Sequence, residues 1–208
     1  IYLDHPDIES VAICDKDEKR LRTVGESFGI SQQYSNIEDV LDSDDFDAIH
    51  LISGIPDHAW QTVAVLQSGK HCACTVPMAT TVEECREITR LSRETGKKYM
   101  MMETVVYSRE FLFVKELYQN GELGKIQFLQ ASHQQDMDGW PDYWPGLPPM
   151  HYATHCVGPC LALTDSLADY CSCYGSGTIR EELIPEYNSP FAVETTHIKF
   201  KDSDLCAR

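Results

Sequence analysis

Two histidines four residues apart, His151 and His155, stand beside Tyr152 in the sequence HYATH. If this segment is helical, the two imidazoles share one face and the phenol lies next to them. Imidazole and phenol groups arranged in this way are typical of proton transfer, and paired imidazoles also bind metals. A zinc site is only weakly indicated because no H-E-x-x-H pattern is present. His133 can project into the same space, although a structural, hydrogen-bonded role remains an alternative for each histidine.

Two carboxylates follow apolar runs that read as strands: Asp15 after VAIC and Glu103 after three methionines. A carboxylate at such a strand end can accept hydrogen bonds from both hydroxyls of an adenosine ribose and repels a 2′-phosphate, so Asp15 favours NAD over NADP. Glu103 can bond a ribose or a nicotinamide amide. The alternative for both is an ordinary strand-end role, as a helix cap or in a salt bridge.

The segment 47–77 must position further groups. An apolar run, a turn with Gly54 and Pro56, a helix-like stretch and a second apolar run form one strand–helix–strand crossover. Crossovers of this kind indicate a parallel sheet covered on both faces, with ligands beyond the carboxyl ends of the strands. The residues after the two runs, 53–58 and 75–77, are therefore expected on one rim, together with Glu103.

The remaining pattern predicts two domains. Helices are expected over 16–28, 36–41, 81–95 and 108–120, and a strand over 99–102. Longer strands over 126–132, 169–175 and 192–201 are suited to an antiparallel sheet, so the boundary is placed near Val105. The loop 136–149 carries Trp140, Trp144 and a tyrosine among prolines and glycines, which suits a pocket wall or a loop packed on the sheet.

Composition limits the class of protein. The chain has 208 residues, of which 42% are apolar, and a net charge of −16. A surface so acidic argues against nucleic-acid or membrane binding, and no apolar run is long enough to cross a bilayer. Nine cysteines, several inside apolar runs, indicate reduced core thiols and a cytoplasmic location; the pairs Cys72/Cys74 and Cys171/Cys173 favour packing over metal binding.

Several pieces together resemble the Gfo/Idh/MocA family of NAD(P)-dependent sugar oxidoreductases. They are VAICD (11–15), DAIHLISGIPDHAWQTV (47–63), GKHCACTVPMATTVEE (69–84), GELGKI (121–126), HYATHCVGP (151–159) and NSPFAVET (188–195). The resemblance implies an NAD-binding Rossmann domain over 1–104, and an α/β domain with a mostly antiparallel open sheet over 105–208. It also implies a sugar or polyol substrate between the domains, and a homo-oligomer formed through the C-terminal sheet. Both ends are expected to be incomplete, with the first strand and its Gly-rich loop lying before residue 1.

The departures from the family pattern leave three hypotheses open. The family's Glu-Lys-Pro is here Thr75-Val76-Pro77, its Asp-x-x-x-His is His151-x-x-x-His155, and Trp60 stands where many members have histidine. The first hypothesis is an NAD-dependent oxidoreductase acting on a sugar-like hydroxyl. The second is an NAD-dependent glycoside hydrolase, a branch that lacks the same lysine and oxidises C3 transiently; the third is a non-catalytic NAD- or sugar-binding protein.

The predicted site residues fall into three groups, and no resident metal is expected. Acid–base chemistry is assigned to His155, with Tyr152, His151 and Glu103 in support. Substrate contacts are predicted at His133, Trp140, Trp144, His151 and His155. Cofactor contacts are predicted at Asp15, Ser53, Gly54, Ile55, Pro56, His58, Thr75, Val76, Pro77 and Glu103.

Overall fold

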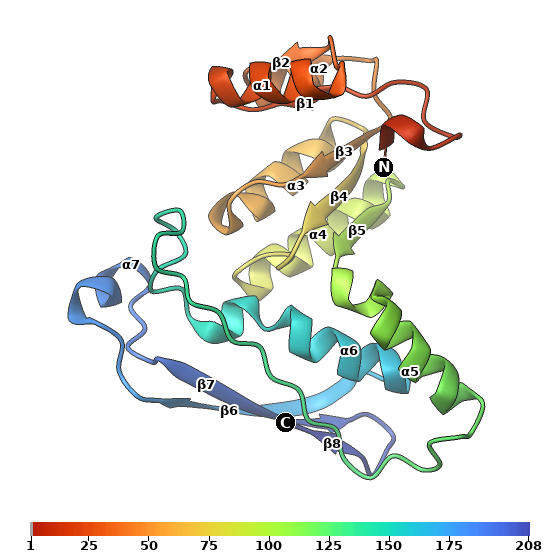
Figure 1. Ribbon diagram of the computed structural model, residues 1–208, viewed down its shortest axis with the longest axis vertical. Coiled ribbons are helices and arrows are strands. Elements are labelled where there is room, and N and C mark those ends of the chain that lie inside the picture. The colour runs from red at the N-terminus through yellow and green to blue at the C-terminus, as the bar shows by residue number, and fades with distance from the viewer. Residues whose placement is uncertain (1) are drawn as a thin grey trace.

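The computed structural model describes residues 2–208, and its N-terminal part is built from parallel strands alternating with helices (Figure 1). Strands β1 (Ile13–Cys14) and β2 (Gln33–Tyr34) form one parallel pair, and β3 (Ala48–Leu51), β4 (His71–Thr75) and β5 (Tyr99–Met102) form a second parallel sheet. The helices between them are α1 (Glu18–Phe28), α2 (Ile37–Asp42), α3 (His58–Gln67) and α4 (Val82–Thr95). The expected parallel α/β domain is confirmed.

The crossover β3–α3–β4 forms the centre of this part. Its two strands pair in parallel from Ala48 opposite His71 to Leu51 opposite Cys74. Cys72 and Cys74 alternate into the core, as the pleat of a strand requires, and burial raises the pKa of these thiols to about 11 and about 12. They are packed as small apolar side chains, in agreement with the sequence-based interpretation.

Local signals explain where the helices begin and end. Helix α4 starts at a capping box, in which Thr81 and Glu84 each bond the other's backbone N–H. Helix α1 is capped by the Asp17 carboxylate and stops at Gly29, whose φ of 67° is a left-handed conformation that suits glycine.

The C-terminal part has one antiparallel sheet beneath a helix. Strands β6 (Ala168–Ser176), β7 (Val193–Phe200) and β8 (Cys206–Ala207) form the sheet, and α6 (Thr154–Thr164) lies over it (Figure 1). A core cluster from α6, β7, β8 and the turn before β8 joins the two layers: Cys160, Ile198, Phe200, Leu205 and Ala207. Helix α5 (Arg109–Gln119) and the short α7 (Ile184–Tyr187) complete this part.

One predicted strand is wrong. Residues 126–132 do not form a strand; only Leu129 makes a β-bridge, parallel to Ala207. Backbone bonds join Leu129 and Ala131 to the segment around β8, at 3.0–3.2 Å. These bonds reach Arg208 but give a single bridge and no strand over 126–132. The predicted division of the chain at residues 104/105 falls within the 3₁₀ helix η3 (Thr104–Tyr107) and stays a prediction.

Candidate active site

A cavity of about 320 Å³ lies where the carboxyl ends of the parallel strands meet the start of α6. This volume is at the lower end of the range for small-molecule sites. Residues from both parts of the chain line it: Ile52, Ser53, Ile55, His58, Thr75, Val76, Met102, Thr104, Tyr143, Trp144, Tyr152 and His155. Part of the rim predicted from the strand ends and two of the predicted proton-transfer residues, Tyr152 and His155, therefore share one cavity.

A hydrogen-bonded chain of three side chains lies at this cavity. His155 Nδ1 is 2.7 Å from Glu103 Oε1, and His155 Nε2 is 3.0 Å from the Tyr152 hydroxyl. Since a carboxylate oxygen accepts, the proton of a neutral ring belongs on Nδ1, and Nε2 accepts from the phenol. The arrangement is a relay from phenol to imidazole to carboxylate, with His155 in the middle.

The Glu103 end of the relay is held by the neighbouring backbone and by close packing on α6. Glu103 follows β5 and accepts from the Val105 backbone N–H at 3.0 Å, which caps η3. Its side chain is only 6% exposed, and within residues 2–208 its second oxygen, Oε2, has no hydrogen-bond partner. Gly158, one turn after His155 on α6, makes room for it: a Cβ at Gly158 would lie 3.0 Å from Glu103 Cγ.

Burial keeps the phenol of the relay protonated. Desolvation raises the pKa of Tyr152 above its ordinary value, and the nearby Glu103 carboxylate adds to the rise. His133 packs on the same group, with its ring 5.0 Å from that of His155 and 5.6 Å from that of Tyr152. The prediction that His133 projects into this space is in agreement with the structure.

The aromatic segment 136–149 forms the wall opposite the rim. The Trp144 ring lies 4.8 Å from Tyr152 in a T-shaped contact, and Tyr143 approaches Gly54 so closely that a Cβ there would lie 3.1 Å from the ring. The segment is anchored to the connection between β6 and β7. Arg180 pairs with Asp138 at 2.9 Å, and the Tyr187 hydroxyl donates to the Tyr143 carbonyl at 2.5 Å.

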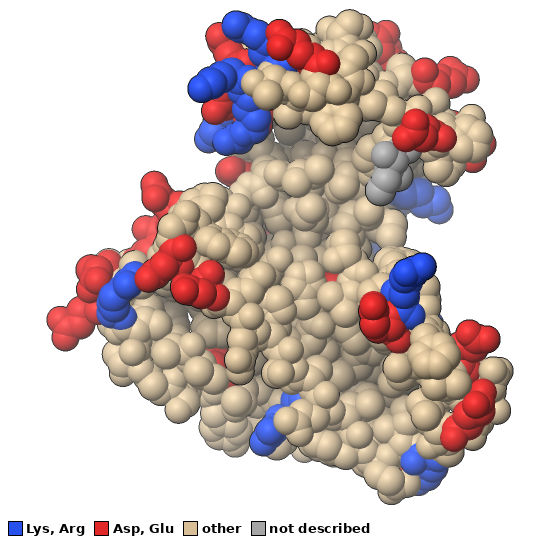
Figure 2. All heavy atoms as spheres, in the orientation of Figure 1, with Lys and Arg blue, Asp and Glu red and all other residues tan. Residues whose placement is uncertain are grey.

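Asp15 lies outside this cavity, directly after β1. Its Oδ1 accepts from the Asp17 backbone N–H at 2.9 Å, and its Oδ2 pairs with Arg20 Nη1 at 3.1 Å. A carboxylate has about four acceptor positions, so capacity for further hydrogen bonds remains. Figure 2 shows that Lys and Arg side chains gather over α1, next to this strand end.

Two predicted residues are not brought to the relay. His151 ends up on the 3₁₀ helix η4 (Pro149–Tyr152), and α6 begins only at Thr154, so the expected shared helical face does not form. His151 instead makes a T-shaped contact with Tyr187 at 6.5 Å.

Trp140 contacts Trp144 at 5.0 Å but does not line the cavity. Gly54, Pro56 and Pro77 lie along the rim without lining the cavity themselves.

Other cavity residues were missed from the sequence. Ile52 and Met102 are neighbours of predicted rim residues, so the strand-end argument could have included them, as it includes Thr104 next to Glu103. Tyr143 is the tyrosine of the loop 136–149, which the sequence offers as a pocket wall, although nothing local indicates its contact with Gly54. A larger hollow of about 570 Å³ lies along α4, lined by that helix alone, and brings no groups from other elements together.

Metal-ligand clusters and membrane spans are both absent from the described chain. Over residues 2–208, no three His, Cys, Asp or Glu side chains are grouped so that they could hold a metal ion. Within the same range, no helix is both long and apolar enough to cross a membrane.

Comparison with known proteins agrees with this geometry. Residues 1–103 match the family model of Gfo/Idh/MocA, described as "Oxidoreductase family, NAD-binding Rossmann fold". This N-terminal half of the chain is thus a Rossmann domain of the Gfo/Idh/MocA oxidoreductase family, and the resemblance read from the sequence is confirmed. The expected cofactor, NAD, agrees with the family description.

Relatives extend the similarity beyond this half. A "Glycosyl hydrolase family 109 protein" of Shewanella baltica is 28% identical over 183 residues, covering 80% of this chain and 40% of the relative. The chain thus spans about two fifths of the length of such relatives.

Solved structures share the fold of both parts. An aldose-aldose oxidoreductase from Caulobacter crescentus, complexed with glycerol, aligns over 99% of this chain and 63% of its own, with a TM-score of 0.81 and 21% identity. A scyllo-inositol dehydrogenase from Lactobacillus casei, with NAD(H) and scyllo-inositol bound, covers 100% of this chain and 63% of its own, with a TM-score of 0.73 and 14% identity.

Proposed function

We propose that the protein is an NAD-dependent oxidoreductase that acts on a hydroxyl of a sugar or polyol. The observation that carries this proposal is the Glu103–His155–Tyr152 relay beside a strand-end rim of the NAD-binding family. Oxidising an alcohol needs a hydride acceptor and a group that takes the hydroxyl proton. The relay provides the second, so the absence of the family lysine at Val76 does not by itself exclude turnover.

The residues present fit the cofactor. The cavity is lined in part by the hydroxyl side chains of the rim, Ser53, Thr75 and Thr104. Asp15 keeps acceptor capacity where the adenosine ribose would bind, as predicted from the sequence. NAD, when bound, supplies the acceptor for the hydride from the substrate carbon.

His155 takes the proton in this proposal. Its Nε2 is the acceptor of the relay, and Glu103 on Nδ1 stabilises the positive charge that the ring gains. The proton reaches Nε2 either directly or through Tyr152, whose phenol gives its own proton to Nε2 while taking that of the substrate. Both routes conserve one proton and leave His155 charged.

The aromatic segment is proposed as the substrate wall. Trp144 and Tyr143 line the cavity next to Tyr152, while His133 packs on Tyr152 and Trp140 packs on Trp144. Ring faces next to polar groups suit a sugar, which has apolar C–H faces and hydroxyl edges. Support for this substrate class comes from neighbours described as sugar or inositol enzymes.

A direct test compares turnover in two histidine variants of the full-length protein. With NAD and a panel of sugars and polyols, wild type is expected to form NADH, and His155→Ala to be slower by about 10²–10⁴-fold. His5→Ala, at an exposed histidine distant in the chain from His155, is the matched control, and its turnover should equal that of wild type. NADH formation unaffected by His155→Ala would contradict the assignment of the proton acceptor.

The second candidate is an NAD-dependent glycoside hydrolase. It is favoured by Val76 in place of the lysine and by the curated relatives named glycosyl hydrolase family 109. In this case the same relay acts, but oxidation is transient. Release of the aryl group from aryl glycosides without net NADH would select this candidate, whereas binding of NAD or sugar without either reaction would indicate a non-catalytic protein.

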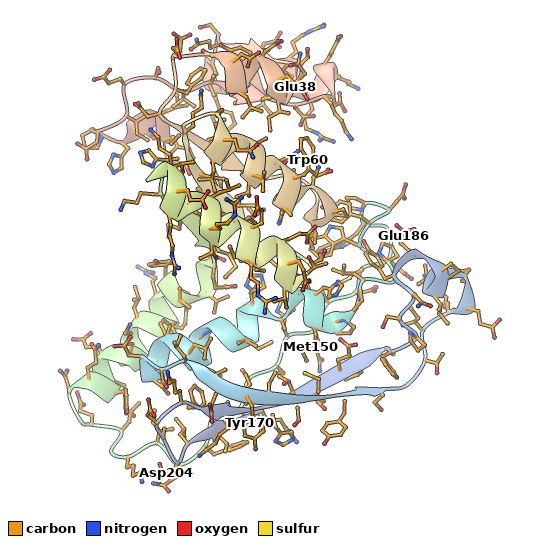
Figure 3. All side chains as sticks on the ribbon, turned by 180° about the vertical axis from the view of Figure 1, so that it is seen from behind. Glu38, Trp60, Met150, Tyr170, Glu186 and Asp204 are labelled. Carbon is orange, nitrogen blue, oxygen red and sulfur yellow. The ribbon has the colours of Figure 1, made fainter. Side chains whose placement is uncertain are left out.

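We also propose that two copies associate through the outer face of the C-terminal sheet. Tyr170, Tyr174 and Val193 are 55–66% exposed on this face. Figure 3 shows Tyr170 pointing away from α6. Exposed apolar patches of this kind mark interaction surfaces. Light scattering should give a dimer or higher oligomer for wild type and a smaller species for Tyr174→Asp.

A cytoplasmic location stays a prediction. It is supported by the nine cysteines, each of which is a free thiol in the described chain.

A further inference from the structure

His58, the first residue of α3, is buried between the two strand-end segments of the rim. It is 1% exposed, and both ring nitrogens contact backbone oxygens. Nδ1 is 2.7 Å from the Pro77 carbonyl, and Nε2 is 3.1 Å from the Ser53 carbonyl and 3.3 Å from the Thr75 hydroxyl. One side chain therefore touches the ends of both β3 and β4.

The contacts leave no ring nitrogen for a ligand. A carbonyl only accepts, so Nδ1 donates to Pro77. In a neutral ring, Nε2 accepts from the Thr75 hydroxyl; in a charged ring, Nε2 donates to the Ser53 carbonyl. In either state the ring bonds the segment after β4 through Pro77, and its position is fixed between the two segments.

Within residues 2–208, no β-sheet hydrogen bond joins the two rim segments to each other. The β3–β4 pairing ends with Leu51 opposite Cys74, before the two rim segments begin. Beyond this point the segment after β3 is held to α3 by Ser53 Oγ, which donates to Gln61 Oε1 at 2.5 Å. His58 adds the link across to Thr75 and Pro77.

We propose that His58 is a positioning residue that fixes the spacing of the segments 53–55 and 75–77, and through it the affinity for the cofactor. The first part of this proposal, the spacing of the two segments, does not depend on a ligand. The second part, the affinity for the cofactor, rests on the proposed function. It differs from the sequence-based prediction, in which His58 is a cofactor contact. A histidine that merely fills the core would leave the rim unchanged when replaced by a side chain of similar size.

The experiment uses His58→Phe, His58→Gln and the control Thr62→Val in the full-length protein. Thr62 is 0% exposed and lies one turn further along α3, so it reports a general loss of core stability. Amide hydrogen exchange, measured without cofactor, is expected to be at least about 10-fold faster over residues 53–55 and 75–76 in His58→Phe, and unchanged there in Thr62→Val. His58→Gln retains a donor and should recover part of the protection.

Calorimetry with NAD tests the functional half. His58→Phe is expected to bind NAD about 10- to 100-fold more weakly, and the loss in kcat/KM for NAD should exceed any loss in kcat. If wild type binds no NAD, the proposed function fails while the exchange result still decides the role of His58. If His58→Phe folds and its amide hydrogen exchange over the rim segments equals that of wild type, the inference is wrong. If His58→Phe does not fold, His58→Gln is compared with wild type in the same way.

Discussion

The two ends of the proposed cofactor site each pair a carboxylate with a nitrogen donor, but in different surroundings. His155 and Glu103 are 2.7 Å apart, with side chains 15% and 6% exposed, whereas Arg20 and Asp15 are 3.1 Å apart, with side chains 66% and 27% exposed. Water and salt screen the second pair, and the first pair lies where charges interact strongly and an unpaired charge is costly. The distances are alike, so burial, and not contact geometry, should decide what each pair contributes.

The largest effect on this comparison is expected from Glu103→Gln. The amide cannot stabilise a charged His155 and can hold the ring in the wrong tautomer, so turnover should fall by about 100-fold or more. Steady-state kinetics measures this, with Glu110→Gln, at an exposed position of α5, as the control. Equal rates in Glu103→Gln and wild type would show that the buried pair is structural only.

Tyr152→Phe should lower turnover by about 10-fold or more, because the hydroxyl of the relay is lost. The pKa of Tyr152 is raised by burial and by Glu103, so the phenol is protonated in the folded protein throughout the neutral range. The ratio of wild-type to variant rate should therefore be constant between about pH 6 and 9. A ratio that falls steadily with rising pH would mean that the phenol ionises in this range.

The same shift has a consequence for stability. A phenol whose pKa is raised on folding contributes stability that is present below its unfolded pKa of about 10 and is lost as the pH rises through the folded pKa. Tyr152→Phe should therefore lose less free energy of unfolding than wild type as the pH becomes alkaline. At acid pH, the free energy of unfolding of the two proteins should depend on pH in the same way.

Gly158→Ala should give a smaller change at the buried end. The added Cβ would lie 3.0 Å from Glu103 Cγ, so the carboxylate must shift by a few tenths of an ångström, and about a 5-fold loss of turnover is expected. Alanine favours a helix over glycine by up to about 1 kcal/mol, so the melting temperature should not fall much. The control is the reverse exchange on the same helix, Ala162→Gly, which should lower the melting temperature and leave turnover unchanged. A wild-type rate in Gly158→Ala would contradict the close packing against Glu103.

The smallest effect is expected at the exposed end. A double-mutant cycle of Asp15→Asn and Arg20→Ala, followed by unfolding, should give a coupling energy below about 1 kcal/mol that decreases with added salt. A coupling as large as that of the buried pair would remove the contrast between the two ends.

The sequence predicts what short-range rules determine. Parallel strands must end on one rim, and this rule alone places Ser53, Thr75 and Glu103 near one another. The capping box at Thr81 locates the start of α4 in the same way. These signals lie within a few residues of the feature that they determine.

Features that depend on distant packing could not be read in this way. Glu103 and His155 are 52 positions apart, so neither sequence neighbourhood shows their hydrogen bond. His151 was misplaced because the change from 3₁₀ to α-helix around Ala153 breaks the periodicity assumed for HYATH. The segment 126–132 has a strand-like pattern, but a strand also depends on a partner that is distant in the chain, and only Leu129 forms a bridge.

The anchoring of the aromatic segment by Arg180 and Tyr187 has a practical consequence. The proposed substrate wall is carried by one segment and braced by a second, the connection between β6 and β7, which holds no part of the relay. In the proposed function, the residues that brace the wall are therefore separate in the chain from those of the relay. A library that varies residues 177–192 should change which molecules are accepted while the proton-transfer apparatus is left untouched.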